Sequence, residues 1–270
     1  MGKVDGLPEI NVAEIFTALR KTPAAKPLRS MLRFGPFRHE TESPQHWKKV
    51  LGPSANSFTH MPYVYKFLRK MIATELQISP NFFTKEEQKT LLLAAACHDF
   101  GEAVINGQGV GDIIIIWKKP YHEEQEHKVF DEVLAMLKLP KKLKGEISTA
   151  YNIVMREKTN RLGHYFNAIE KTEYLDTILK VYRNHLTGNR IKNRQLLIGQ
   201  VLTTYIPPLI EHTEQYVSIK KYLGKNRHFI SSAFKYTYRD YVNHDPTDKR
   251  YVKGIETSLQ KWTEFSSALR

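Results

Sequence analysis

The sequence predicts an all-α fold. Apolar residues recur every three or four positions along most of its 270 residues, which is the period of an α-helix with one buried face. Outside the short isoleucine-rich run 113–117, which could be a short strand or a buried loop, no segment suggests a strand. Prolines and glycines interrupt the apolar pattern at intervals, as they do at helix ends. These observations favour a bundle of helices.

The expected elements follow in order along the chain. Residues 1–45 are predicted to form an N-terminal arm, with a short helix at 11–19 followed by an irregular stretch rich in proline. Further helices are predicted at 57–77, 85–104, 121–138, 143–158, 163–185, 193–206 and 208–223. The pair Pro207-Pro208 is expected to separate the last two of these helices. A final helix is predicted at 251–268.

Composition is consistent with a catalytic domain that carries basic extensions. A hydrophobic fraction of 41% is sufficient for a core, and the formal net charge is +13. Lys and Arg outnumber Asp and Glu in 1–50 (9 against 5) and in 180–270 (16 against 7), but the two are equal in 51–179 (16 each). The basic flanks could attract phosphate groups of nucleotides, RNA or DNA, although no known nucleic-acid-binding motif accompanies them. Nucleic acid is therefore not the favoured partner.

The single cysteine, Cys97, excludes a disulfide framework and favours a reducing, cytoplasmic compartment. No segment resembles a signal peptide, and the isoleucine-rich run is far too short to span a bilayer. We therefore expect no membrane association.

The pair His98-Asp99 is the most informative local feature. Thr84 and Glu87 form a predicted capping box that opens a helix, and His98 and Asp99 fall at the end of that helix. If the helix continues, Glu102 shares a face with both. A divalent cation would satisfy an imidazole and carboxylates brought together beside an apolar run. The alternative interpretation is a helix that simply ends in polar residues.

His60 strengthens the metal interpretation. It lies in the first turn of the predicted helix 57–77, a segment in which apolar residues repeat at helical spacing. A histidine in this setting is either a metal ligand or a core residue bonded to a neighbouring carbonyl group.

These residues resemble the HD-domain phosphohydrolases, whose metal ligands are an early His, an adjacent His-Asp pair and a later Asp. The stretch from His98 to Glu102, followed by Gly111-Asp112 and Lys118, is most similar to the bacterial HD-domain 5'-deoxynucleotidases and their phage dNTP-hydrolase relatives. Here about five additional residues, 106–110, separate the Glu from the Gly-Asp. The resemblance implies an HD helical core at 46–185, between the arm 1–45 and a basic helical extension 186–270 packed on that core.

The fourth metal ligand predicted from the resemblance is Glu170, where the family usually has Asp. Asp176 is the rival candidate, but it lies nearly opposite the apolar face of the predicted helix, whereas Glu170 borders that face. In a third interpretation both carboxylates are solvated and water completes the site. The ion would be Mn, Co, Fe or Zn, because mixed His and carboxylate ligands suit these metals.

The resemblance also implies roles around the metal. Glu102 would orient water and carry a proton, Lys118 would hold the substrate phosphate, and Asp112 would contact sugar or base. The family has an Arg-Trp pair before its first His; here the pair is His46-Trp47, with Arg38 or Lys48 as replacement cations. Trp47 either walls the pocket or anchors the N-terminal segment.

The predicted function is metal-dependent hydrolysis of a phosphate ester or anhydride in a (deoxy)nucleotide, and the sequence does not distinguish monophosphate from triphosphate substrates. A two-metal cyclic-dinucleotide phosphodiesterase would need extra ligands such as His122 and His127, whose spacing of five residues suits one helix face poorly. A non-catalytic nucleotide- or RNA-binding module is the alternative of another class. The C-terminal extension could form a homodimer, cover the site or contact a partner.

Overall fold

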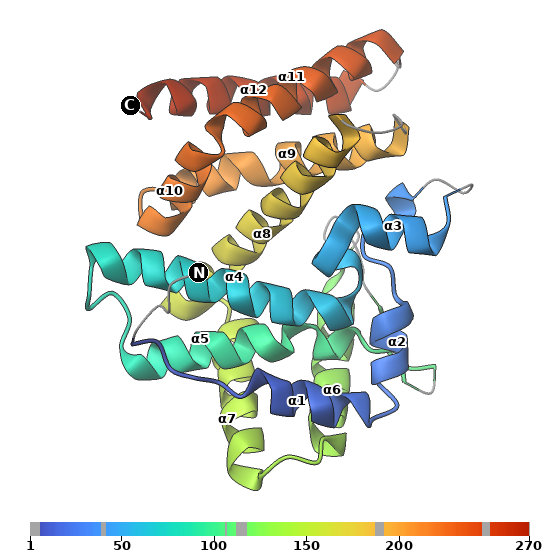
Figure 1. Cartoon of the computed structure of the whole chain (residues 1–270), viewed down its shortest axis with the longest axis vertical. Helices are drawn as coiled ribbons and strands as arrows, with labels where there is room; N and C mark the ends of the chain where they lie inside the picture. Colours follow the sequence, from blue (N-terminus) through green and yellow to red (C-terminus); the bar gives the residue numbers. More distant parts are fainter. Residues whose placement is uncertain are drawn as a thin grey trace. The chain divides into compact units, whose positions relative to one another are not determined.

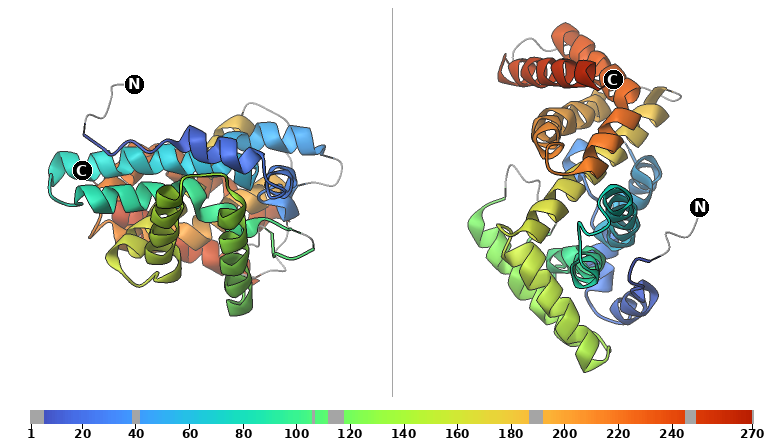
Figure 2. Two further views of the ribbon diagram at one scale, coloured as in Figure 1. Left: turned by 90° about the horizontal axis from the view of Figure 1, so that it is seen from below. Right: turned by 90° about the vertical axis from the view of Figure 1, so that its left-hand side faces the viewer.

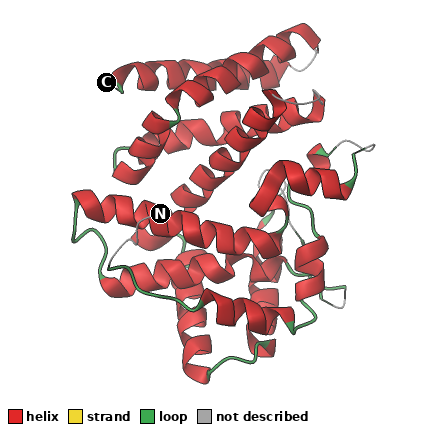
Figure 3. Ribbon diagram, in the orientation of Figure 1, coloured by secondary structure: helices red, strands yellow, loops and turns green. Residues whose placement is uncertain are grey.

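The computed structural model confirms the all-α prediction. It describes residues 6–38, 42–105, 107–111, 118–186, 192–244 and 249–269. Within these ranges the chain forms helices joined by turns and loops, and no residue lies in a named strand (Figure 3). The isoleucine-rich run and Asp112 lie outside the described residues. None of the described helices combines the length and the apolar character that a membrane crossing needs.

The chain divides into two compact units (Figure 1). The first comprises Met1–Arg33 and Gly52–Asn167, and the second comprises Phe34–Leu51 and Ala168–Arg270. Their boundaries differ from those of the three predicted segments.

Helix α5 (Lys85–Cys97) lies in the core of the first unit, and its residues from Thr90 to Cys97 are all buried. Helix α4 lies beside α5 (Figure 2), and α7 packs on α5 as well. The run of small side chains in Ala94–Ala96 lets neighbouring helices approach α5 closely. In chain order, the elements of this unit are α1 (Val12–Arg20), α2 (Ala25–Ser30), η2 (Gly52–Ala55), α4 (Ser57–Ile78), α5 (Lys85–Cys97), η3 (His98–Glu102), α6 (Pro120–Met136), α7 (Lys141–Tyr151), the π-helical turn Asn152–Arg156 and the first part of α8 (Arg161–Leu186).

The second unit is built around α9, which contacts η1, α10, α11 and α12. Tyr174 of α8 stacks on Tyr205 of α9 with ring centroids 5.3 Å apart. Its elements are η1 (Gly35–Phe37), α3 (Pro44–Leu51), the remainder of α8, α9 (Lys192–His212), α10 (Val217–Lys225), α11 (Arg227–His244) and α12 (Lys249–Ala268).

The predicted break at Pro207-Pro208 was wrong, because α9 continues through both prolines to His212. Pro207 has no N–H to donate to the carbonyl group of Thr203 four residues earlier. The hydroxyl of Ser258 on α12 donates to that carbonyl oxygen instead, at 3.2 Å. A contact between helices therefore replaces the bond that the proline removes, and the chain turns only after α9 ends.

Candidate metal centre

The start of α4 positions His60. The side chain of Asn56 accepts a hydrogen bond from the backbone N–H of Thr59 at 2.9 Å and caps the helix, as N-terminal Asn residues commonly do. His60 follows in the first turn, and it is only 2% exposed. The predicted helix start and the predicted place of His60 in it are therefore confirmed.

The end of α5 positions His98 and Asp99. The predicted capping box of Thr84 and Glu87 is present at the start of this helix. At its end, Cys97 adopts φ −133° and ψ 0°, which interrupts the α-helix, and His98–Glu102 forms a 3₁₀ turn. The predicted α-helix 85–104 is therefore shorter than expected, and the two ligand candidates lie at the break.

The 3₁₀ turn is held against α6 by a close backbone approach at Gly101. A Cβ atom on Gly101 would lie 2.4 Å from the carbonyl oxygen of Glu126, well inside normal contact distance. Only glycine permits this approach without a shift of η3 or α6. The position of His98 and Asp99 thus depends on a residue that carries no functional group.

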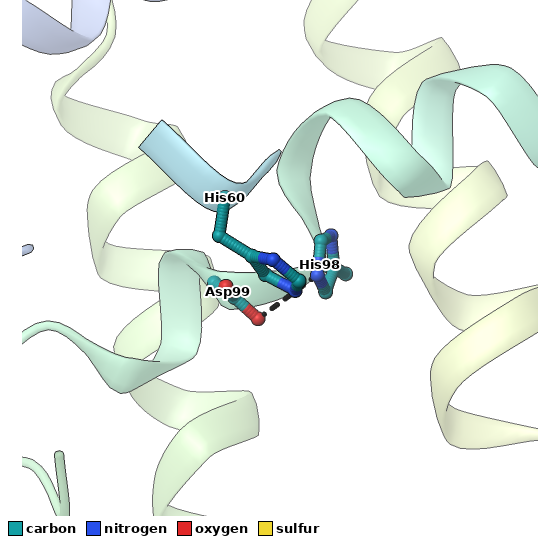
Figure 4. Close-up of side chains that lie close together, drawn as sticks. All are labelled: His60, His98 and Asp99. Carbon is teal, nitrogen blue, oxygen red and sulfur yellow. Dashed lines mark ion pairs between the residues drawn. The ribbon is translucent and has the colours of Figure 1, made fainter. Parts of the chain in front are cut away.

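The structure brings three of the four predicted metal ligands together (Figure 4). One ligand atom from each of His60, His98 and Asp99 lies within 4.8 Å of the other two, and all three side chains are buried. Nε2 of His98 lies 3.1 Å from Oδ1 of Asp99, and the rings of His60 and His98 are 5.2 Å apart. No other group of three or more His, Cys, Asp or Glu side chains among the described residues meets this distance criterion.

The hydrogen bonding of His98 favours metal coordination. Its Nδ1 lies 2.9 Å from the carbonyl oxygen of Ala95. A carbonyl oxygen only accepts, so Nδ1 carries a proton and donates it, which makes Nε2 the nitrogen that can offer a lone pair to a metal. This nitrogen faces Asp99. A carbonyl acceptor behind a coordinating imidazole is the usual arrangement in metal sites.

His60 has a different partner. Nη1 of Arg33 lies 2.5 Å from Nδ1 of His60, and Arg33 is itself only 3% exposed. Burial, the charge of Arg33 and the charge of His98 lower the pKa of His60 well below its usual value. His60 is therefore neutral at neutral pH, as a ligand must be. The sequence analysis did not single out Arg33, which lies in the stretch predicted to be irregular.

The donor set of two imidazoles and one carboxylate fits a divalent transition metal. Nε2 of His98 lies beside the Asp99 carboxylate, and both side chains are buried. His60 supplies the third donor when its ring is not accepting a hydrogen bond from Arg33. The three side chains therefore fit such a metal.

Glu102 lies on the same 3₁₀ turn but outside the three-residue group. In a 3₁₀ helix, residues three apart in the sequence lie on the same face. Glu102 therefore shares a face with Asp99, but not with His98 four residues earlier, as an α-helix would have placed it. Oε2 of Glu102 accepts a hydrogen bond of 2.6 Å from the hydroxyl group of Ser57, at the start of α4. Ser57 was not predicted as a site residue.

Lys118 lies close to several acids. Its Nζ atom pairs with Oε2 of Glu126 at 2.6 Å. Burial lowers the pKa of Lys118, but the charge and hydrogen bond of Glu126, together with the charges of Glu102 and Glu123, outweigh burial and raise it. The ammonium group is therefore charged at neutral pH and lies within the electrostatic reach of Glu102.

Ile105 and Gln108, at the described residues around the insertion that follows Glu102, pair through their backbones. The backbone groups of Ile105 and Gln108 exchange two hydrogen bonds of 2.8 Å each. Asp112 lies outside the described residues, so its predicted contact with sugar or base stays a prediction.

The other predicted site residues lie in the second unit. Trp47 is fully buried, and both interpretations of it stay open. Nε2 of His46 accepts a hydrogen bond of 2.9 Å from Arg194, and Arg194 also pairs with the buried Glu42 at 2.9 Å. Arg194 is thus a cation beside His46 that the sequence did not indicate. Of the two cations predicted to compensate for His46, Arg38 donates to the backbone carbonyl of Glu42 and Lys48 is exposed.

Glu170, the predicted fourth ligand, is half-buried on α8 within the second unit and stays a prediction. The rival Asp176 is engaged inside this unit: it accepts a hydrogen bond of 2.8 Å from Tyr222 and pairs with Lys180 at 2.7 Å.

The two histidines considered for a second metal have other partners. Nδ1 of His122 accepts from the backbone N–H of Lys119 at 3.1 Å. His127 lies 3.1 Å from the Tyr151 hydroxyl group. Neither belongs to the three-residue group, so this geometry does not favour the two-metal alternative.

No protein-family model, curated protein or solved structure matches the chain.

Proposed function

We propose that the protein is a divalent-metal-dependent phosphohydrolase that acts on nucleotides or deoxynucleotides. The observation that carries this proposal is the buried convergence of His60, His98 and Asp99. Two imidazoles and a carboxylate within 4.8 Å of one another suit a metal better than they suit an apolar core. The resemblance in the sequence supports the choice of phosphate chemistry, with Glu170 as the proposed fourth ligand.

A bound divalent cation would supply Lewis acidity, which lowers the pKa of water and offsets the charge of a phosphate group. Glu102 would act as the proton carrier. The hydroxyl group of Ser57 holds one of its carboxylate oxygens at 2.6 Å, which fixes the carboxylate while the other oxygen receives a proton. Lys118, kept charged by its acidic neighbours, would bind a phosphate oxygen.

The test is a panel of nucleotide mono-, di- and triphosphates, with each base and both sugars, assayed with Mn²⁺, Co²⁺, Zn²⁺ and Mg²⁺. We expect release of phosphate, pyrophosphate or triphosphate with at least one metal. Asp99→Ala should abolish this release and lower the metal content of the purified protein. Metal content that is unchanged in Asp99→Ala would remove Asp99 from the ligand set.

A second candidate is a non-catalytic module that binds RNA or nucleotides. Residues 217–239 contain no Asp or Glu, and Lys220, Lys221, Lys225 and Arg227 are exposed there. Such a surface suits a phosphate backbone. RNA binding that weakens with salt, together with no hydrolysis under any of the four metals, would decide for this module.

A further inference from the structure

The contact between Arg33 and His60 constrains the candidate metal centre. Nη1 of Arg33 and Nδ1 of His60 are 2.5 Å apart, and both side chains are at least 97% buried. A guanidinium group carries only donors. The ring nitrogen of His60 must therefore accept, with its lone pair directed at Arg33.

A neutral imidazole has one N–H group and one lone pair. When Nδ1 accepts from Arg33, the proton lies on Nε2, and the ring has no second lone pair for a metal. A metal ion and a guanidinium group that both contact the His60 ring would in addition repel each other, because both are positive. His60 can thus serve Arg33 or a metal, but not both.

We propose that Arg33 and a divalent cation compete for the imidazole ring of His60, and that Arg33 binds a phosphate oxygen of the substrate once the metal holds His60. This inference rests on the proposed function, since the metal and the phosphate both belong to it. The identity of the metal does not enter the argument.

A backbone hydrogen bond anchors Arg33 close to the start of α4, which carries His60. The N–H of Arg33 donates to the carbonyl oxygen of Ala55 at 3.1 Å, just before the start of α4. A guanidinium group displaced from His60 therefore stays near the ligands and keeps its positive charge. A phosphate group offers two oxygens in the geometry that the guanidinium fork matches.

Competition of this kind couples metal binding to phosphate binding. Phosphate that holds Arg33 away from His60 raises the affinity for the metal, and the metal raises the affinity for phosphate by the same factor. The metal and the substrate would therefore bind more tightly together than separately.

The experiment compares Co²⁺ binding by the full-length wild type and Arg33→Met, with titration calorimetry and the visible absorption of the bound ion. We expect Arg33→Met to bind Co²⁺ about tenfold more tightly, which corresponds to about 1.4 kcal/mol. Arg29→Met is the matched control, because Arg29 lies on α2, is exposed and stacks on Phe58 with its guanidinium carbon 4.5 Å from the ring centroid. Its Co²⁺ affinity should equal that of the wild type.

Arg33→Lys keeps a cation without the planar fork and should give an intermediate Co²⁺ affinity, and circular dichroism checks that each variant is folded. The gain in Arg33→Met should disappear in a His60→Ala background, because the competition takes place on that ring. Added inorganic phosphate should tighten Co²⁺ binding more in the wild type than in Arg33→Met. At saturating metal, Arg33→Met should raise KM for the nucleotide more than it lowers kcat.

A Co²⁺ affinity that is unchanged or weaker in folded Arg33→Met would overturn the inference, as would a gain that persists without His60. If the wild type hydrolyses nucleotides in that case, the proposed function survives. If the gain is present and no variant hydrolyses any nucleotide, the competition stands and the proposed function fails.

Discussion

Replacement of glycine by alanine should have opposite effects on stability at two positions. It should destabilise the protein at Gly101, where the 3₁₀ turn packs on α6, and stabilise it at Gly145 in α7. Gly101→Ala places a methyl group 2.4 Å from the Glu126 carbonyl oxygen, whereas ordinary contacts begin at 3.4 Å. Backbone must therefore move by about 1 Å, and overpacking of this kind costs roughly 1–3 kcal/mol. Gly145→Ala, inside α7, meets no atom within 4 Å. It should instead stabilise the protein by about 0.5–1 kcal/mol through helix propensity.

The assay is urea denaturation followed by circular dichroism, together with Co²⁺ binding at a temperature where both variants are folded. Gly101→Ala should lower the free energy of unfolding and also weaken Co²⁺ binding, because η3 carries His98 and Asp99. Gly145→Ala should raise stability and leave Co²⁺ affinity unchanged. Gly101→Ala with wild-type stability and metal affinity would refute the reasoning that this contact positions the ligands.

Three further predictions concern single side chains. Glu102→Ala should lower turnover by roughly 10²–10⁴-fold while Co²⁺ stays bound, and Ser57→Ala should cause a smaller loss; full turnover in Glu102→Ala would exclude the assigned role. Burial raises the pKa of Glu87, but hydrogen bonds from Arg161 and the helix cap outweigh it, so the folded pKa lies below 4.5. The stability that Glu87 contributes is therefore present above pH 4.5 and lost as pH falls through the folded pKa, and Glu87→Gln should flatten that part of a pH–stability profile; an identical profile would contradict the assignment. Burial raises the pKa of the Cys97 thiol, so a thiol reagent should react with Cys97 only at the rate of unfolding, and rapid labelling of the native protein would count against this burial.

Local signals in the sequence were sufficient for much of the site. The capping box at Thr84 set the start of α5, and the apolar repeat after Ser57 set the start of α4. These two helix starts determine where His60, His98 and Asp99 lie along their elements. Their convergence was predicted from residue type, and the structure shows it. Their role as metal ligands and the activity stay proposals.

Other features depend on contacts between segments that are distant in the sequence. Arg33 lies in a stretch without periodicity, so only the fold reveals that its guanidinium group reaches His60. The end of α5 at Cys97 could not be predicted locally, because that position is neither proline nor glycine. The structural feature next to it is the close backbone approach between Gly101 and Glu126 of α6. The length of α9 was underestimated because proline chemistry predicts a local break, and a tertiary hydrogen bond overrides that prediction.

The Ser258 hydroxyl group also bears on how the C-terminal helices acquire their structure. A nascent or shortened chain that lacked α12 would leave the Thr203 oxygen to be satisfied by solvent, at the level of the proline pair. Helix α9 would then be free to bend at the proline pair, with a shorter helical segment on each side. Completion of α9 as one continuous helix is therefore coupled to synthesis and docking of α12 (Lys249–Ala268).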